Sequence, residues 1–274
     1  MTLASRPPVI TLLTDYGVAD EFVGVLHGVI ARICPAAHVI DLSHAVPRQD
    51  VRAGAALLSR SLPYMPVGLH VAVVDPTVGS DRRAVALRLA DGRTLLGPDN
   101  GLLWPAAQQA GGVVQAAEIS ASRWRLEPQA ATFHGRDIFA PVAAHLAGGE
   151  PLSRAGEPLD PALLVRLEAP PAQTGPGTLI ATVVGTDGFG NVQLSAESDQ
   201  LDAELGDTLQ VGADAGVAVS GSYARTFSDV DEGELLVLED SSRQLALAIN
   251  RGNAAARLEL RTGDRVRITN PRRA

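Results

Sequence analysis

The sequence contains no lysine, a single cysteine and few aromatic residues. All 23 basic residues of the 274-residue chain are arginine. Without lysine the chain cannot form a Schiff base with pyridoxal phosphate or complete a G-x-x-x-x-G-K-[ST] phosphate-binding loop. The lone cysteine, Cys34, excludes an internal disulfide framework and any zinc site that needs several thiolates. These absences exclude pyridoxal phosphate enzymes, enzymes with a lysine-containing phosphate-binding loop, and proteins built on disulfides or zinc–thiolate sites.

Long hydrophobic runs are also missing. Every apolar run falls far short of the roughly 18 residues that a membrane-spanning helix needs, and the N-terminus has no signal-peptide pattern. We therefore expect a cytoplasmic protein that does not bind membranes. The formal net charge of −8 argues against a nucleic-acid partner, which would normally face a basic surface. The same charge is compatible with a cationic small-molecule substrate.

The N-terminal part alternates short apolar runs with helical patterns, which is typical of an α/β domain. A continuous β-prone run, Val9–Thr14, ends at Asp15, and apolar residues then recur at helical spacing until Pro35. The segment 84–98 indicates a hairpin that turns at Asp91-Gly92. We predict a central, mostly parallel sheet in an N-terminal domain, residues 1–165. Its other strands are expected at 39–42, 69–74 and 113–119, and its other helices at 52–62 and 137–149.

The pattern changes in the C-terminal part. Six prolines lie between Gly148 and Gly177, and hydrophobic periodicity fades there, which indicates a domain boundary. Short strand candidates then follow one another between Gly, Asp, Asn and Ser turns. This spacing predicts a small antiparallel β-barrel domain, residues 166–274. The candidate strands are 179–184, 191–194, 208–211, 217–219, 234–238, 244–249 and 265–268.

Polar clusters follow three of the predicted parallel strands. They begin at Asp15 in T-D-Y-G-V-A-D, at Asp41 in D-L-S-H and at Asp75 in D-P-T-V-G-S-D-R-R. One such aspartate alone more often caps the next helix than binds a ligand. Because ligands of α/β sheets collect beyond the carboxyl ends of the strands, three of them together indicate a ligand site.

Two further segments carry candidate functional residues. In T-F-H-G-R-D, His134 precedes Gly135, which allows close approach of a ligand; His134 is either an acid, base or water-holding group, or a histidine bonded to its own loop. The other histidines are expected to be mainly structural. The segment T-D-G-F-G-N-V is either an ordinary turn or a purine-binding loop formed by Asp187, Phe189 and Asn191. The motifs H-E-x-x-H, G-x-S-x-G and G-x-G-x-x-G are absent.

Several segments, taken in order, closely resemble one family. They are TDYGVADEFVGVLHGVI, VVDPTVGSDRR, LLGPDNGLL, TFHGRDIFAPVAAHL, TDGFGNVQLS and LALAINRGNAA. The chain resembles the S-adenosyl-L-methionine (SAM) hydroxide adenosyltransferases, which are hydrolases related to the fluorinases and chlorinases. The resemblance implies an N-terminal α/β domain joined to a C-terminal β barrel. It also implies homotrimers whose active sites lie between the N-terminal domain of one subunit and the C-terminal domain of its neighbour.

The resemblance further implies an activity and its residues. SAM is the substrate, so that no cofactor or metal is expected, and water attacks its 5′ carbon to give adenosine and L-methionine. Asp75, Arg82 and His134 match the residues that hold this water; Arg82 is preferred to Arg83 because the family's arginine lies seven residues after the aspartate. The matching also assigns substrate-binding residues: Asp15 to the ribose, Asp187, Phe189 and Asn191 to the adenine or methionine parts, and Ser241 and Ser242 to the methionine carboxylate.

Three alternatives stay open. The first is a SAM-dependent halogenase of the chlorinase type, although the halogenases carry a serine at the position of Gly135 and the fluorinases an inserted loop that this chain lacks. The second is a nucleoside-binding trimer without catalysis. The third is a metal-dependent phosphohydrolase built on Asp15, Asp20, Asp75 and His134, since carboxylates and imidazole bind divalent ions.

Overall fold

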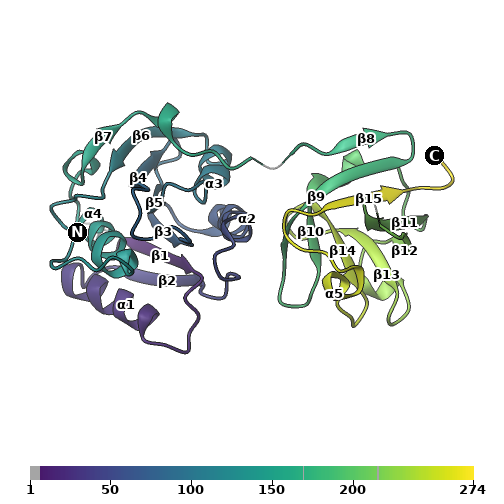
Figure 1. The fold of residues 1–274 in the computed structure, drawn as a ribbon, viewed down its shortest axis with the longest axis horizontal. Coiled ribbons are helices and arrows are strands. Elements are labelled where there is room, and N and C mark those ends of the chain that lie inside the picture. Colours follow the sequence, from purple (N-terminus) through teal and green to yellow (C-terminus); the bar gives the residue numbers. More distant parts are fainter. Residues whose placement is uncertain (1–6, 169, 215) are drawn as a thin grey trace, which may run out of the picture. The chain divides into compact units, whose positions relative to one another are not determined.

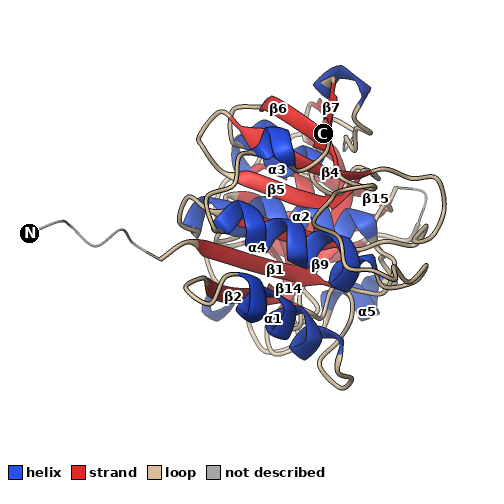
Figure 2. Cartoon of the chain, turned by 90° about the vertical axis from the view of Figure 1, so that its left-hand side faces the viewer, coloured by secondary structure: helices blue, strands red, loops and turns tan. Residues whose placement is uncertain are grey.

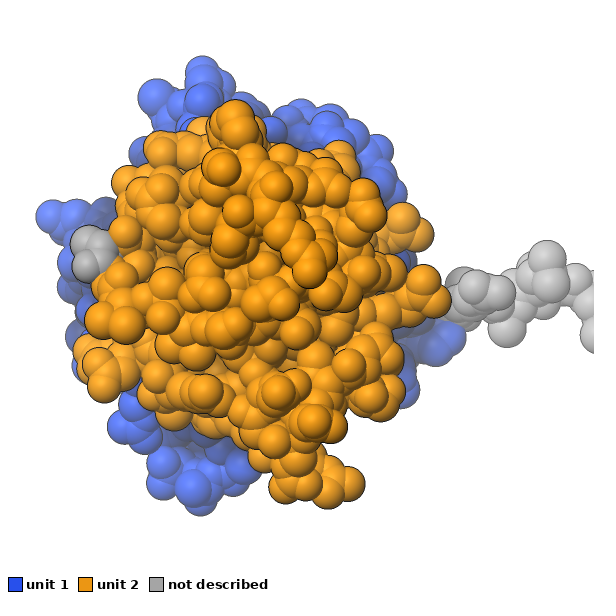
Figure 3. Space-filling view, turned by 90° about the vertical axis from the view of Figure 1, so that its right-hand side faces the viewer, with its two compact units in different colours: residues 1–168 blue, residues 169–274 orange. Residues whose placement is uncertain are grey.

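The chain forms two compact units, residues 1–168 and 169–274, which Figure 3 colours separately. The computed structural model describes residues 7–168, 170–214 and 216–274. Within these ranges no helix combines the length and the apolar character that crossing a membrane requires.

The first unit is built on a seven-stranded mixed sheet in the order β2-β1-β3-β5-β4-β6-β7. The four strands β2, β1, β3 and β5 run parallel to one another, and β4, β6 and β7 add antiparallel pairings. The predicted parallel sheet and the 84–98 hairpin are confirmed, and only the short edge strand β7 was not predicted. The strands are β1 (Val9–Thr14), β2 (His38–Ser43), β3 (Leu69–Val73), β4 (Ala84–Leu89), β5 (Thr94–Pro98), β6 (Val113–Glu118) and β7 (Glu157–Leu159).

Helices cover both faces of this sheet (Figures 1 and 2). Helices α1 (Phe22–Ile33) and α4 (Ala140–Ala147) pack on one face, and α2 (Val51–Ser61) and α3 (Trp104–Gln109) pack on the other. A π-helical turn, η2 (Gly135–Phe139), leads directly into α4. Because the central strands are buried on both faces, their sequences are continuous apolar runs rather than alternating ones.

The parallel register aligns the ends of the central strands. Thr14, the last residue of β1, lies beside Val73, the last residue of β3. The residues that follow, which include Asp15 and Asp75, therefore leave the sheet at the same edge. This edge carries the first unit's candidate site.

The second unit is a closed barrel. Its strands follow the order β10-β14-β13-β12-β11-β15-β9, and a pairing between β10 and β9 closes the ring, with β8 added outside β9. All pairings are antiparallel except β12–β13, which is parallel, so the predicted antiparallel barrel is right apart from this pair. The strands are β8 (Gln173–Gly175), β9 (Thr178–Thr186), β10 (Val192–Glu197), β11 (Thr208–Ala213), β12 (Val219–Tyr223), β13 (Leu235–Glu239), β14 (Gln244–Ile249) and β15 (Arg265–Thr269).

Short helical turns complete the two units. One of them, α5 (Ala254–Leu258), is capped at its N-terminus by Asn253, whose side chain accepts a hydrogen bond from the backbone N–H of Ala256. Single 3-10 turns occupy η1 (Leu62–Tyr64), η3 (Leu152–Arg154), η4 (Pro161–Leu163), η5 (Ser198–Gln200) and η6 (Phe227–Asp229).

A buried histidine in β3 makes the stability of the first unit depend on pH. His70 is fully buried; its Nδ1 lies 3.0 Å from Oγ1 of Thr11, and its Nε2 is a buried atom without a hydrogen-bond partner. Burial, with a smaller contribution from Arg93, lowers the pKa of His70 to about 4. The unfolded chain therefore binds this proton at a higher pH than the folded chain, and acid favours unfolding.

We expect the free energy of unfolding to fall as the pH drops from about 6.5 to about 4, by roughly 3 kcal/mol through this one group. Urea titrations at several pH values measure the loss. In His70→Gln the slope in this window should be shallower than in the wild type, because glutamine does not titrate. His38→Gln, at an exposed histidine, should keep the wild-type slope. Equal slopes in all three proteins would contradict the prediction.

Candidate active site

Three residues from separate segments of the first unit meet beyond the strand ends. Asp75 follows β3, Arg82 precedes β4, and His134 directly precedes η2. The side chains of Asp75 and Arg82 are 5% and 8% exposed, and His134 is also buried. The structure therefore brings together the three residues that the sequence suggested as a water-holding group.

Arg82 connects the other two. Its Nε donates to both carboxylate oxygens of Asp75, at 3.1 and 2.9 Å, and its Nη2 also contacts Oδ2. The same Nη2 donates to Nδ1 of His134 at 2.7 Å. A planar guanidinium suits this arrangement because its N–H groups point in fixed directions toward two partners.

These bonds fix the protonation of His134. A guanidinium only donates, so Nδ1 must accept, and the ring proton of the neutral imidazole sits on Nε2. The side-chain amide nitrogen of Gln129 lies 3.1 Å from Nε2; turning the amide by 180° puts its oxygen at this position, where it accepts the proton. Burial, and then the charge of Arg82, lower the pKa of His134, with Asp75 and Asp137 acting in the opposite direction. The imidazole is therefore neutral at neutral pH.

The neighbouring arginine has different partners. Arg83 donates to Oδ2 of Asp99 through Nε at 2.9 Å and Nη2 at 2.6 Å, and to the carbonyl oxygen of Leu163 at 2.6 Å. Asp99 also accepts a backbone hydrogen bond from Val165. Arg83 thus ties the segment after α4 to the sheet, whereas Arg82 faces Asp75 and His134.

The loop after β1 is held rigidly at the same edge. Oδ2 of Asp15 accepts from the backbone N–H of Gln49 at 2.9 Å. The backbone N–H of Gly17 donates to the carbonyl oxygen of His44 at 2.7 Å, and Nδ1 of His44 lies 2.8 Å from Oγ1 of Thr14. Asp15 is only partly buried, so its carboxylate has room to accept a ligand's hydroxyl groups.

Tyr16 is a residue of this edge that the sequence reasoning missed. Its ring packs against Phe22 at 6.0 Å and Phe133 at 5.9 Å between centroids. Its hydroxyl oxygen lies 2.5 Å from the position that a Cβ at Gly135 would take, next to His134. The available signal was an aromatic residue directly after Asp15, at a strand end already identified.

In the barrel, the predicted loop between β9 and β10 is a tight turn organised by Asp187. The carboxylate of Asp187 accepts from the backbone N–H groups of Phe189 and Asn191, both at 2.9 Å, and from the Asn191 amide at 2.8 Å. Gly190 has a positive φ, and a Cβ there would collide with the side chain of Asn253. Phe189 is 81% exposed, so its ring is free to stack on a ligand.

Ser241 and Ser242 do not lie beside this loop. They belong to the turn between β13 and β14, where the backbone N–H of Ser242 donates to Asp240 at 2.7 Å. In the β10–β14 pair, Val192 is aligned with Leu247 and Glu197 with Gln244. The two groups therefore sit at opposite ends of this strand pair, roughly 17 Å apart at about 3.4 Å per residue. Only a ligand extended along the strands could meet both.

Comparison with known proteins places these segments in one family. The model of the SAM hydroxide adenosyltransferase N-terminal domain matches residues 10–156, and that of the corresponding C-terminal domain matches residues 181–267. The chain belongs to the SAM hydroxide adenosyltransferase family. The matched ranges contain every candidate residue of both units.

Individual proteins that are similar to this chain support the same family assignment. A Salinispora tropica protein named (R)-S-adenosyl-L-methionine hydrolase is 50% identical over 96% of this chain and 98% of its own length. An Actinopolyspora mzabensis protein named fluorinase is 29% identical over 96% of this chain and 97% of its own length. The crystal structure of an uncharacterised Thermotoga maritima protein superposes with a TM-score of 0.87 at 35% identity, covering 95% of this chain and 99% of that one.

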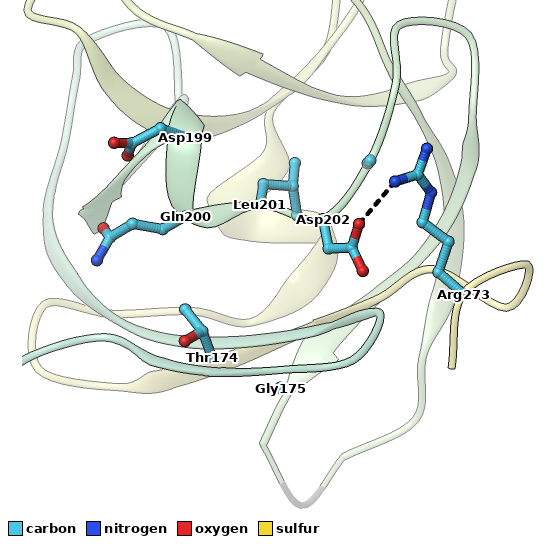
Figure 4. Close-up of a pocket in the computed structure, with 8 residues that line it drawn as sticks. Thr174, Gly175, Asp199, Gln200, Leu201, Asp202 and Arg273 are labelled. Carbon is cyan, nitrogen blue, oxygen red and sulfur yellow. Dashed lines mark hydrogen bonds and ion pairs between the residues drawn. The ribbon is translucent and has the colours of Figure 1, made fainter.

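A hollow on the barrel of this family member is lined by none of the candidate residues. Figure 4 shows this hollow, with a volume of about 570 Å³ and a rim that includes Asp202 and Arg273. Arg273 donates to Asp202 at 2.7 Å and to Glu204 at 2.6 Å, so its charge is already neutralised. Within the described ranges, no three His, Cys, Asp or Glu side chains are arranged to hold a metal ion.

Proposed function

We propose that the protein hydrolyses SAM at its 5′ carbon and releases adenosine and L-methionine. The observation that carries the proposal is the buried bridge from Asp75 through Arg82 to a neutral His134. A relative sharing half of its residues with this chain is named for this hydrolysis.

The reaction is an in-line displacement. The water oxygen forms a bond to C5′ as the C5′–S bond breaks, and the electron pair of that bond goes to sulfur, which leaves as the neutral thioether of methionine. The water must also lose a proton. Asp75 is the only anion of the three residues and takes this proton in the proposal, while Arg82 orients the water and His134 holds the Arg82 guanidinium in place. Orientation of this kind supplies up to roughly 7 to 11 kcal/mol of the barrier reduction.

The other candidate residues bind the rest of the substrate. Asp15 accepts the ribose hydroxyls, and the exposed ring of Phe189 stacks on the adenine beside Asp187 and Asn191. In this proposal the methionine carboxylate reaches the Ser241–Ser242 turn, so the substrate lies extended along β10 and β14. No cofactor takes part, because SAM itself carries the leaving group.

We further propose that the active protein is a homotrimer. In it, the α/β unit of one subunit and the barrel of its neighbour form each active site. The proposal rests on the resemblance to the family, which covers both the α/β unit and the barrel. We also propose that the reaction takes place in the cytoplasm.

The halogenase alternative is less well supported because of Gly135. A Cβ at this position would lie 2.5 Å from the hydroxyl of Tyr16, and atoms cannot approach so closely without displacement. The serine that halogenases carry there would therefore displace the hydroxyl of Tyr16. The intact bridge between Asp75, Arg82 and His134 likewise favours catalysis over a binding protein without turnover.

The test is incubation of the purified protein with SAM in buffer containing EDTA, with and without chloride and fluoride, followed by mass spectrometry. We expect adenosine and methionine in equal amounts under every condition. A 5′-halo-5′-deoxyadenosine product would assign a halogenase instead. Activity lost in EDTA and restored by a divalent ion would support metal-dependent hydrolysis, and unchanged SAM would refute the proposal.

A further inference from the structure

The bonds within the bridge leave few groups to hold a water molecule. Arg82 occupies Nδ1 of His134, and Gln129 faces Nε2. Both oxygens of Asp75 already accept from Arg82. Because a water positioned for in-line attack needs partners in several fixed directions, a further polar group beside the bridge would restrict it more closely.

Tyr16 places such a group at the bridge. Its loop leaves β1 beside the segment that leaves β3 toward Asp75, since Thr14 and Val73 are aligned. Its hydroxyl lies over the backbone of Gly135, with Oη 2.5 Å from the position of a Cβ there. Gly135 directly follows His134, so the hydroxyl lies at the His134 end of the bridge, and the charges of Asp75 and Arg82 are near enough to act on it.

The hydroxyl is rigid and available. Phe22 and Phe133 pack against the ring, and their own centroids lie 5.1 Å apart in an edge-to-face contact. No hydrogen bond joins the Tyr16 hydroxyl to any residue in the described ranges of the chain. Burial, followed by the charges of Asp15 and Asp75, raises the pKa of this phenol. It therefore stays neutral and can both donate and accept.

We infer that the Tyr16 hydroxyl is a fourth catalytic group, which holds the attacking water beside Asp75, Arg82 and His134. The inference rests on the proposed hydrolysis. In this arrangement the phenol oxygen accepts a hydrogen bond from one water hydrogen, and the second water hydrogen points to Asp75. The absence of a side chain at Gly135 keeps the hydroxyl in place.

The first experiment compares the steady-state kinetics of the wild type and Tyr16→Phe, which keeps the aromatic packing and removes only the hydroxyl. We expect kcat to fall roughly 10- to 100-fold, as for a misplaced reactant, while KM for SAM and the thermal unfolding temperature stay close to wild type. An unchanged kcat in an active enzyme would overturn the inference and leave the proposed function standing. A wild type that yields no adenosine would overturn both.

Gly135→Ala gives an independent second variant. Its methyl group would displace the hydroxyl of Tyr16, and we expect a loss of kcat similar to that of Tyr16→Phe. In the double variant Tyr16→Phe/Gly135→Ala the methyl group meets only ring carbons, at 3.2 and 3.3 Å, so the two losses should be far from additive. If Gly135→Ala instead lowered kcat equally in both backgrounds, it would act through His134, and the claim that Gly135 keeps the hydroxyl in place would be refuted.

Discussion

Replacing Arg82 by lysine is expected to lower the turnover of SAM roughly 100-fold, the scale of loss that small misplacements at a reacting centre cause. Lysine keeps the positive charge beside Asp75, but its single ammonium group lacks the rigid fork that reaches both Asp75 and Nδ1 of His134. Discontinuous assay of adenosine by liquid chromatography measures the loss. Binding of the product adenosine should change little, because Arg82 is bonded to neither Asp15 nor Phe189, the residues proposed to bind the ribose and the adenine.

Arg83→Lys is the matched control. Both arginines are paired with a carboxylate of the same unit, at Asp75 and Asp99, but only Arg82 donates to His134. We expect Arg83→Lys to retain nearly all turnover and to lower the unfolding temperature slightly, since the contact with the Leu163 carbonyl weakens. Equal losses of turnover in the two variants would show that the bridge through Arg82 is not what supports catalysis.

The sequence predicted the scaffold of this site well. Continuous apolar runs that end at Asp15 and Asp75 identify buried parallel strands, and the edge where such strands end is where ligands bind. The local sequence pattern could not predict contacts between residues that lie far apart in the chain. Arg82 and His134 are separated by 52 residues, and their contact depends on how η2 and α4 pack on the sheet. The segment T-F-H-G-R-D made His134 a candidate, but the family resemblance, rather than periodicity, gave it a role and selected Arg82.

The missed elements share a physical reason. Strand β8 is exposed throughout, and β7 contains Pro158 and lies at a sheet edge. Such strands are held by backbone pairing to a neighbour, so their side chains carry little hydrophobic pattern. β12 begins at Val219 rather than spanning 217–219, because its glycine and serine residues hide the alternation. Tyr16 was missed because one aromatic residue in a turn has no periodicity.

Mixing two inactive variants is expected to restore activity if each site is shared between subunits. His134→Ala leaves the Asp75–Arg82 pair in place but removes the imidazole, and Phe189→Ala/Asn191→Ala removes the stacking ring and amide from the barrel. Base–aromatic stacking alone contributes roughly 1–3 kcal/mol, so the barrel variant should bind SAM poorly. Each variant by itself should therefore show little turnover.

In co-expressed mixed trimers, some sites receive their α/β unit from the barrel variant and their barrel from the His134→Ala variant. With equal amounts and random cyclic assembly, about a quarter of the sites combine the two intact halves. We expect adenosine formation to recover to about that fraction of the wild-type rate, measured after co-expression with two different affinity tags. If both halves of a site came from one chain, every site would keep a defect and no recovery would occur, which would exclude the shared site without affecting the assignment of the bridge residues.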